Sequence, residues 1–85
     1  MNIKITGKEL KATDSIKNYI EKKCERLVKY FGEDFDVQAT IKTEGKDQVA
    51  EMHVNTTNGV FRAVTGSKDL YASIDKNIDI VEGQI

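Results

Sequence analysis

The sequence lacks proline and contains only one cysteine and one histidine among its 85 residues. A single cysteine, Cys24, excludes an intramolecular disulfide and a cysteine-rich zinc site, and it is compatible with a reducing compartment. No apolar run approaches the ~20 residues of a membrane-spanning helix, and no signal-peptide pattern is present. These absences argue against secretion and a membrane partner, and they predict a cytoplasmic protein.

Length and composition predict one small folded domain spanning residues 1–85. Hydrophobic residues make up 39% of the chain and charged residues 32%, which suits a small soluble globule and not a disordered chain. Neither a low-complexity tract nor an internal repeat interrupts the sequence. The chain therefore carries no sign of a linker or a domain boundary.

The overall charge argues against a nucleic-acid partner. Thirteen Lys and Arg residues oppose fourteen Asp and Glu residues, for a formal net charge of −1. Binding to nucleic acid depends largely on cations that neutralise phosphates, so only an uneven charge distribution would support it. Residues 14 to 31 contain five basic and three acidic residues, whereas residues 33 to 51 contain two basic and six acidic ones. The near-neutral total thus conceals a polarised distribution.

Hydrophobic periodicity predicts the element order β-α-β-β-β-α. Apolar residues alternate over residues 2 to 6, as in a strand, and recur at helical spacing between the N-cap candidate Thr13 and the stop signal Gly32. Further strands are predicted at 35 to 43, 48 to 56 and 60 to 65, with a second helix at 68 to about 83. We therefore predict an α+β fold whose four-stranded sheet carries both helices on one apolar face.

Turn and cap residues support these boundaries. Asn58-Gly59 between two β-rich runs is a strong hairpin signal, and the polar stretch from Glu44 to Asp47 predicts the preceding turn. Ser67 is the predicted N-cap of the second helix, because its hydroxyl can accept a hydrogen bond from a free backbone N–H. Asp69 would then lie in the first turn, where a negative charge is favourable.

The first helix has a basic edge. On a helical wheel, Lys22, Arg26 and Lys29 fall within roughly 60° of one another. Three further residues flank this edge on the side nearer the core: Tyr19, Lys23 and Tyr30. A tyrosine ring there can reach a sugar or a base beside the phosphate contacts.

Taken alone, the basic edge is better explained as a solvated helix face, because charge runs usually reflect solvation. Outside the first helix, Arg62 lies on the last predicted strand, Lys68 opens the second helix, and Lys76 follows two turns later. If the helices lie side by side, these residues and the basic edge can form one discontinuous basic surface. The sequence permits this arrangement without requiring it.

Other candidate chemistry is weak. His53 lacks partners for a catalytic or metal role and is expected to face solvent beside inward-pointing Met52 and Val54. Cys24 is interpreted as a small core residue. The second helix carries three carboxylates on one edge, which we interpret as solvation and not as a metal or acid–base site: Asp75, Asp79 and Glu82. We therefore predict no enzyme, no metal and no cofactor.

Several short motifs occur in an order and spacing that match a known family. They are Asn-Ile-Lys-Ile-Thr-Gly at 2 to 7, the helix entry at 13 to 23, Leu-Val-Lys-Tyr-Phe at 27 to 31, Arg62-Ala63, and Asp-Leu-Tyr-Ala-Ser-Ile-Asp at 69 to 75. The chain resembles the N-terminal ribosome-binding domain of the ribosome hibernation promoting factors, also called ribosome-associated inhibitors or sigma-modulation proteins. The resemblance covers essentially the whole chain.

The resemblance implies a fold similar to a double-stranded RNA-binding domain with an added strand. It further implies that the domain binds the small ribosomal subunit in the channel used by mRNA and tRNA. Translation would be inhibited by steric block, without covalent chemistry and without a small-molecule substrate. Long members carry a separate C-terminal domain that pairs ribosomes. The resemblance therefore leaves open a longer parent protein and a homodimer formed through such a domain.

Basic residues of both helices contact ribosomal RNA in the family. The matching positions here are Lys22, Lys23, Arg26, Lys29, Lys68 and Lys76, with Arg62 on the neighbouring strand as a weaker match. One departure stands out, because the family's Leu-Glu-Arg-Gln-Leu reads Val-Glu-Gly-Gln-Ile at residues 81 to 85. Gly83 removes a cation expected near Lys76, and glycine lowers helix propensity by up to ~1 kcal/mol relative to alanine.

Two rival functions remain open at the level of sequence. A protein interaction module of α+β fold that does not bind RNA is favoured by the net charge of −1. A small enzyme would need a pocket with convergent titratable groups, which a modest core and a lone histidine do not favour.

Overall fold

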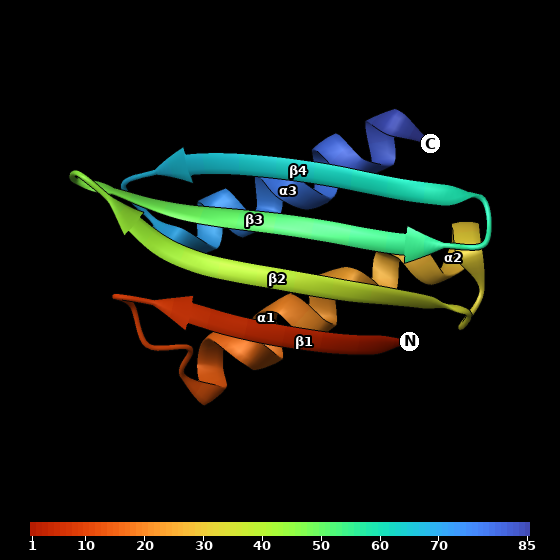
Figure 1. Cartoon of the computed structure of the whole chain (residues 1–85), viewed down its shortest axis with the longest axis horizontal. Coiled ribbons are helices and arrows are strands. Elements are labelled where there is room, and N and C mark those ends of the chain that lie inside the picture. Colours follow the sequence, from red (N-terminus) through yellow and green to blue (C-terminus); the bar gives the residue numbers. More distant parts are fainter.

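A four-stranded sheet carries every helix on one of its faces in the computed structural model, which describes residues 1–85 (Figure 1). The strands are β1 (Asn2–Lys8), β2 (Phe35–Glu44), β3 (Asp47–Thr56) and β4 (Gly59–Ser67). The helical segments are α1 (Asp14–Cys24), the 3₁₀ turn η1 (Glu25–Leu27), α2 (Val28–Phe31) and α3 (Leu70–Gln84). The predicted α+β class and the order β-α-β-β-β-α are confirmed.

The sheet is mixed, with the strands in sequence order β1-β2-β3-β4. β1 runs parallel to β2, which the crossover through the first helix requires, and the other two pairs are antiparallel hairpins. Gly45 turns the first hairpin with a φ of 62°, and Gly59 begins β4 with a φ of 131°. Both angles lie in the region that favours glycine, so the predicted turns are confirmed.

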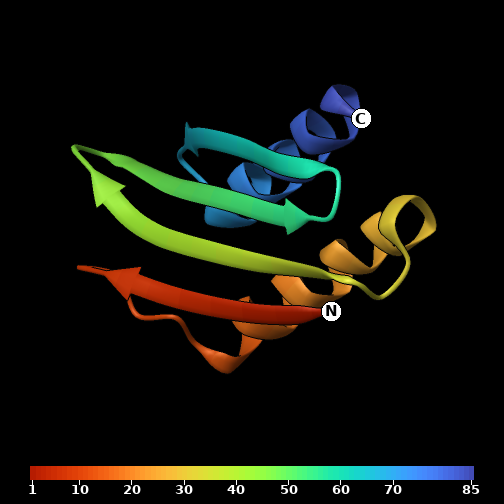
Figure 2. The same cartoon turned by 45° about the vertical axis from the view of Figure 1, so that its right-hand side comes forward.

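The helices pack side by side on one face of the sheet, the first track being α1, η1 and α2 and the second α3. α1 lies behind β1 and β2, and α3 lies behind β3 and β4, so that one sheet face stays bare (Figures 1 and 2). Ile20 and Leu27 from the first track and Ile74 and Ile78 from the second are at most 1% exposed. Burial of each such side chain contributes about 1.5–3 kcal/mol, so this shared layer is the main stabilising element. None of the helices is long and apolar enough to cross a membrane.

Cys24 lies within this core as a free thiol. Burial, with a smaller contribution from the charge of Glu21, raises its pKa to about 12. The thiol is therefore protonated at neutral pH, which confirms its interpretation as a small core residue.

Two local predictions about the helices are wrong. The predicted first helix is not continuous, because η1 tightens the backbone between α1 and α2. The second helix is capped by Asp69 and not by Ser67, since the Asp69 carboxylate accepts a hydrogen bond from the Tyr71 N–H at 3.0 Å. Asp69 has extended backbone angles, so the helix starts only after it, and Ser67 belongs to β4.

A buried polar network fixes α3 on the sheet. Asn77 is fully buried, and its amide donates to the Ala50 carbonyl at 2.9 Å while accepting from the Thr65 hydroxyl at 2.7 Å. The buried Ser73 hydroxyl donates to the Gln48 carbonyl at 2.8 Å. No buried side-chain nitrogen or oxygen lacks a partner. These bonds select one position of α3 along β3 and β4, which apolar contacts alone specify less tightly.

We expect Asn77→Ala to lower the free energy of unfolding by about 2 kcal/mol, because it leaves buried polar partners unsatisfied and opens a small cavity. Urea denaturation followed by circular dichroism measures this change. Lys76→Ala, at the neighbouring exposed position, should change it by less than about 0.5 kcal/mol. Equal effects of the two substitutions would show that the network contributes no more than a surface residue.

Candidate nucleic-acid interface

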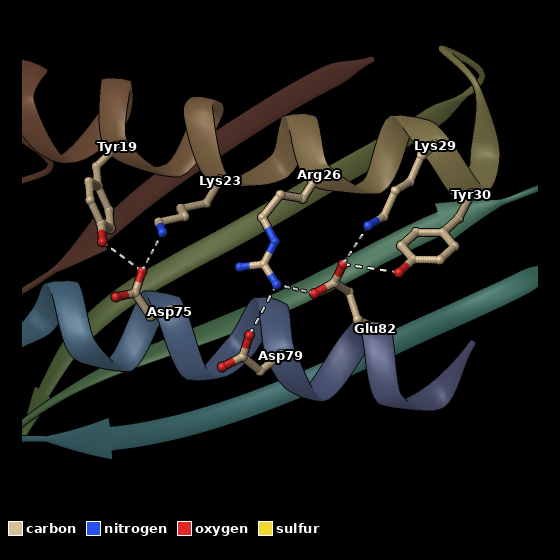
Figure 3. Close-up of polar contacts among 8 residues, drawn as sticks. All are labelled: Tyr19, Lys23, Arg26, Lys29, Tyr30, Asp75, Asp79 and Glu82. Carbon is tan, nitrogen blue, oxygen red and sulfur yellow. Dashed lines mark hydrogen bonds and ion pairs between the residues drawn. The ribbon is translucent and has the colours of Figure 1, made fainter.

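The predicted basic edge of the first helix lies directly beside α3. Figure 3 shows Arg26 and Lys29 of this edge, together with Lys23, reaching towards three carboxylates of α3. At one end, the Asp75 carboxylate accepts a hydrogen bond from the Tyr19 hydroxyl at 2.6 Å and lies 3.4 Å from the Lys23 ammonium. Asp75, which was interpreted from the sequence as a solvated carboxylate, therefore has two partners on α1.

Arg26 occupies the middle of this contact. Its guanidinium pairs with Asp79 at 3.2 Å and also with Glu82, which is only 15% exposed. At the far end, Glu82 accepts a hydrogen bond from the Tyr30 hydroxyl at 3.1 Å and lies 3.9 Å from the Lys29 ammonium. We call the whole set the helix seam. It comprises Tyr19, Lys23, Arg26, Lys29, Tyr30, Asp75, Asp79 and Glu82.

The ion pairs of the seam are accessible to water, so their partners can be exchanged. Side chains of Arg26 and Lys29 are 42% and 66% exposed. Exposed ion pairs contribute only about 0.2–1 kcal/mol each and are screened by salt. A phosphate group can therefore take the place of a seam carboxylate at small cost.

Both tyrosines of the seam make hydrogen bonds and cation–π contacts within it. The hydrogen bond to Asp75, with smaller contributions from burial and nearby charges, raises the pKa of Tyr19 to about 12. The ammonium of Lys23 lies 5.4 Å from the centre of the Tyr19 ring, and that of Lys29 lies 5.1 Å from the centre of the Tyr30 ring. These cation–π contacts and hydroxyl bonds hold both rings beside the cations.

The seven predicted RNA-binding residues do not form one surface. Lys22 lies on the exposed side of α1 without an ion pair, next to Lys23, Arg26 and Lys29 of the seam. The other three lie apart. Lys68 is 3.9 Å from Asp47 in the β2–β3 hairpin.

Lys76 and Arg62 face away from the seam. Lys76 follows Asp75 on α3 and therefore points about 100° further round the helix. Arg62 alternates with buried Ala63 on β4, which places it on the bare sheet face, opposite the helices. The sheet therefore separates Arg62 from the helix cations, and Lys76 lies on the side of α3 turned away from the first helix, beyond the seam carboxylates.

Positive and negative charges cancel over the helical layer, which comprises α1, η1, α2 and α3. The basic members, counting the residues that lead into α3, are Lys17, Lys22, Lys23, Arg26, Lys29, Lys68 and Lys76. The acidic members are Asp14, Glu21, Glu25, Asp69, Asp75, Asp79 and Glu82. Two of these, Glu21 and Glu25, line the flank of α1 that faces β1. The helical layer thus offers local cations but no net positive charge.

The structure shows no arrangement typical of catalysis. His53 lies on the bare sheet face, between Gln38 on β2 and Arg62 on β4. No group of three or more His, Cys, Asp or Glu side chains is placed to hold a metal ion.

Comparison with known proteins identifies the family of the chain, which the geometry of the site alone does not. Residues 3–85 match the model of one family, described as "Sigma 54 modulation protein / S30EA ribosomal protein". The chain belongs to this family. Its members are ribosome-associated proteins, which agrees with the resemblance recognised from the motifs.

Relatives within the family differ in length. A ribosome hibernation promoting factor from Acidithiobacillus ferridurans is 40% identical over 78 residues, which is 88% of this chain and all of the relative. A ribosome hibernation promotion factor from Deinococcus radiodurans is 30% identical over 87 residues, covering 95% of this chain but 45% of the relative. Both short and long members therefore contain this domain.

Solved structures of the family share the fold. The N-terminal domain of Protein Y from Thermus thermophilus superposes with a TM-score of 0.92 at 38% identity, covering 99% of this chain and 94% of that one. A ribosomal subunit interface protein from Coxiella burnetii gives a TM-score of 0.89 at 19% identity, covering 99% and 92%. The latter likeness supports the fold alone.

The family departure at Gly83 leaves an open position. Gly83 lies within α3, and a Cβ atom built on it would meet no atom within 4 Å. A longer side chain would therefore fit without strain. The next residue, Gln84, donates to the Arg62 carbonyl at 2.9 Å, so the helix end is tied to the edge of β4 in spite of the glycine.

We expect Asp75→Asn to lower the pKa of Tyr19 from about 12 towards the ordinary value of 10.0, because the hydrogen bond to the charged carboxylate is the largest cause of the shift. Alkaline titration of tyrosinate absorbance measures this change. Asp79→Asn removes a carboxylate from the same helix and should leave the pKa of Tyr19 unchanged. A Tyr19 that titrates late in both variants would contradict the assignment.

The same bond predicts a loss of stability at high pH. The pKa of Tyr19 in the folded protein lies above that of the unfolded chain, so its contribution is complete below pH 10 and is lost as the pH rises towards about 12. Urea denaturation across this range should show a smaller loss in Tyr19→Phe than in the unchanged protein.

Proposed function

We propose that this chain is a ribosome hibernation factor that binds the small ribosomal subunit in the channel for mRNA and tRNA. It inhibits translation there by steric block. The observation that carries the proposal is the relative from Acidithiobacillus ferridurans, which is named a ribosome hibernation promoting factor and aligns with this chain over its own full length. The name of the Coxiella burnetii protein, a ribosomal subunit interface protein, fits the same setting.

The exposed side of the first helix supports RNA as the bound component. Lys22, Arg26 and Lys29 are exposed along α1, η1 and α2, where they can meet phosphates of ribosomal RNA. We propose Lys22, Lys23, Arg26 and Lys29 as one contact set. Lys68, just before α3, and Lys76, on α3, are separate, weaker contacts, because neither belongs to the helix seam and Lys68 lies 3.9 Å from Asp47.

Binding then proceeds by exchange of partners. A phosphate displaces a carboxylate of α3 from a cation of the seam, and the released carboxylate returns to water. Each exchange keeps the cation paired, so the net gain comes mainly from counterions released from the RNA. The seam therefore moderates affinity without preventing binding.

Steric block requires only a folded body of sufficient size. The Cα atoms extend over 35 × 24 × 16 Å, and the buried network and core hold this shape as one unit. A bound domain of this size excludes other ligands from the space that it occupies. No reacting group is needed for such a block.

We expect replacement of Lys22, Arg26 and Lys29 by Glu to abolish co-sedimentation with small ribosomal subunits, because each reversal repels phosphates. Circular dichroism checks the fold, which matters because Glu at position 26 faces Asp79 and Glu82. The corresponding Gln variant avoids this repulsion and should weaken binding at least 10-fold.

A charge-matched control carries Glu at Lys11, Lys17 and Lys46, which lie in the β1–α1 loop, on α1 and in the β2–β3 turn. This control should bind nearly as well as the unchanged protein. Salt titration of the unchanged protein tests the rival function, since phosphate contacts predict a steep fall of affinity with salt. A shallow slope, with binding retained by the Glu variant, would favour a protein interaction module.

Neutralising the seam carboxylates should increase affinity. In Asp79→Asn/Glu82→Gln, Arg26 and Lys29 lose their competing partners, and we expect at least 3-fold tighter binding to small ribosomal subunits. Glu21→Gln/Glu25→Gln removes the same charge from the opposite flank of α1 and serves as the control. If both pairs tighten binding equally, the effect is one of net charge and the competition is refuted.

A further inference from the structure

The sheet has two free edges, which differ in how they are protected against pairing with another strand. β1 carries Lys4 and Lys8, both exposed, and charged side chains on an edge strand oppose such pairing. β4 is the other edge, and Arg62 is its only charged residue (Figure 1). Two of its valines are exposed on the bare sheet face, Val60 at 63% and Val64 at 48%. The edge of β4 is therefore the one that can accept another strand.

Alternate residues of β4 turn their backbone N–H and C=O groups away from the sheet. Arg62 belongs to this set, because its N–H donates to the Gln84 side-chain oxygen at 3.4 Å and its carbonyl accepts from the Gln84 amide at 2.9 Å. Orientation alternates along an antiparallel pair, so Val60, Val64 and Gly66 also turn these groups outwards. Only Arg62 among the four has a side-chain partner for them.

Gln84 thus occupies one hydrogen-bonding position of a missing neighbouring strand. We call this contact the Gln84 latch. Gln84 is the last residue of α3 and is exposed, so its side chain can move away without disturbing the core. Both hydrogen bonds are exposed, and water can replace them at small net cost. The latch therefore competes with strand addition but does not exclude it.

Apolar side chains flank this edge on both sides of the sheet. Ile80 is 40% exposed and precedes Gln84 by one helical turn, so it lies on the same flank of α3, beside β4. Val60 and Val64 lie on the bare sheet face. A strand added beside β4 would cover all three side chains, which adds hydrophobic burial to the backbone hydrogen bonds.

An acidic hollow of about 310 Å³ adjoins the end of this edge on the bare sheet face. It is lined by Glu44, Asp47, Val49, Val64 and Gly66. Glu44 takes part in no ion pair, and Asp47 has only the exposed Lys68 at 3.9 Å. Gly66 leaves the space open, since a Cβ atom built on it would lie 3.8 Å from the Asp47 carboxylate. The hollow therefore suits a cationic side chain that arrives opposite Gly66.

A second copy of the chain supplies this side chain. When two β4 strands pair antiparallel with Val64 opposite Val64, their outward backbone groups match, and Arg62 of each copy lies opposite Gly66 of the other. Side chains of opposite residues start only about 4.5–5.5 Å apart, so the Arg62 guanidinium reaches the Asp47 carboxylate. Arg62 is exposed and takes part in no ion pair within one chain. The two-fold axis repeats this contact, so the edge is complementary to itself.

We infer that the β4 edge is a surface for self-association, along which two copies of the chain pair their β4 strands antiparallel while the Gln84 latch opposes the pairing. The two sheets become one, and a two-fold axis perpendicular to it keeps all helices on the same face. This dimer needs only residues of the present domain, unlike a homodimer formed through a separate C-terminal domain. It also does not depend on RNA binding. Because a contact along one strand is small, pairing is weak, with a Kd of roughly 100 μM or more.

The first test opens the latch. Gln84→Ala removes both hydrogen bonds to Arg62, and we expect at least 5-fold tighter dimerisation in sedimentation equilibrium between about 20 μM and 1 mM protein. Gln38→Ala is the matched control, because Gln38 is exposed on the bare face of the inner strand β2. It should leave the equilibrium unchanged. A Gln84→Ala protein that stays monomeric, or that associates no more tightly than the control, overturns the inference. Assemblies larger than dimers also contradict it, since pairing uses the β4 edge of each copy once.

The second test exchanges the charges of the contact in the Gln84→Ala background. Arg62→Glu alone should abolish dimerisation, because the new carboxylate would face Glu44 and Asp47. Glu44→Lys/Asp47→Lys alone should abolish it as well, because both lysines would face Arg62. A mixture of the two proteins should restore dimers that contain one copy of each, since both contacts are then attractive. Urea denaturation checks that each variant is folded. Dimerisation of either folded variant alone, or no dimers in the mixture, refutes this surface.

Discussion

The sheet has only one apolar face, and this constraint determines how every charged element is placed. Both helices must cover the same face, so α1 and α3 are forced to lie side by side over Val37, Ile41, Met52 and Val54. Their solvent-facing side chains meet along the helix seam. The opposite sheet face, by the same constraint, has no cover at all.

The seam forms only when the helices pack together, so its near-neutral charge results from the pairing of the two helices and not from either helix alone. The first helical stretch alone has a surplus of cations, and α3 alone has a surplus of carboxylates. Together they neutralise each other through exposed contacts of small individual energy. Such contacts are individually weak, which the proposed exchange of a carboxylate for a phosphate requires.

The proposed RNA partner depends on where the charges lie, because the net charge of the chain is −1. Carboxylates gather at the two ends of β2: Glu33, Asp34 and Asp36 at its start, and Glu44 and Asp47 around the β2–β3 turn. Among the cations outside the helix seam, Lys22 on α1 and Lys4, Lys8 and Arg62 on the bare sheet face take part in no ion pair. With a net charge of −1, long-range attraction to a polyanion is weak, so the proposed binding would depend on local contacts.

Periodicity and turn chemistry in the sequence were sufficient for the fold. Alternation in β2 and β3, the glycines of the hairpins and the apolar spacing of α1 and α3 each act over a few residues, so they can be seen without the tertiary structure. The motif resemblance likewise identified the family. The sequence did not indicate the interruption at η1 or the cap at Asp69, because the competing backbone conformations and the neighbouring cap positions differ by small free energies. Only tertiary structure decided which charges meet: Asp75, Asp79 and Glu82 are 52 or more positions along the sequence from their partners on the first helical stretch. It also decided that Arg62 lies on the opposite face, since that depends on which side of the sheet the helices cover.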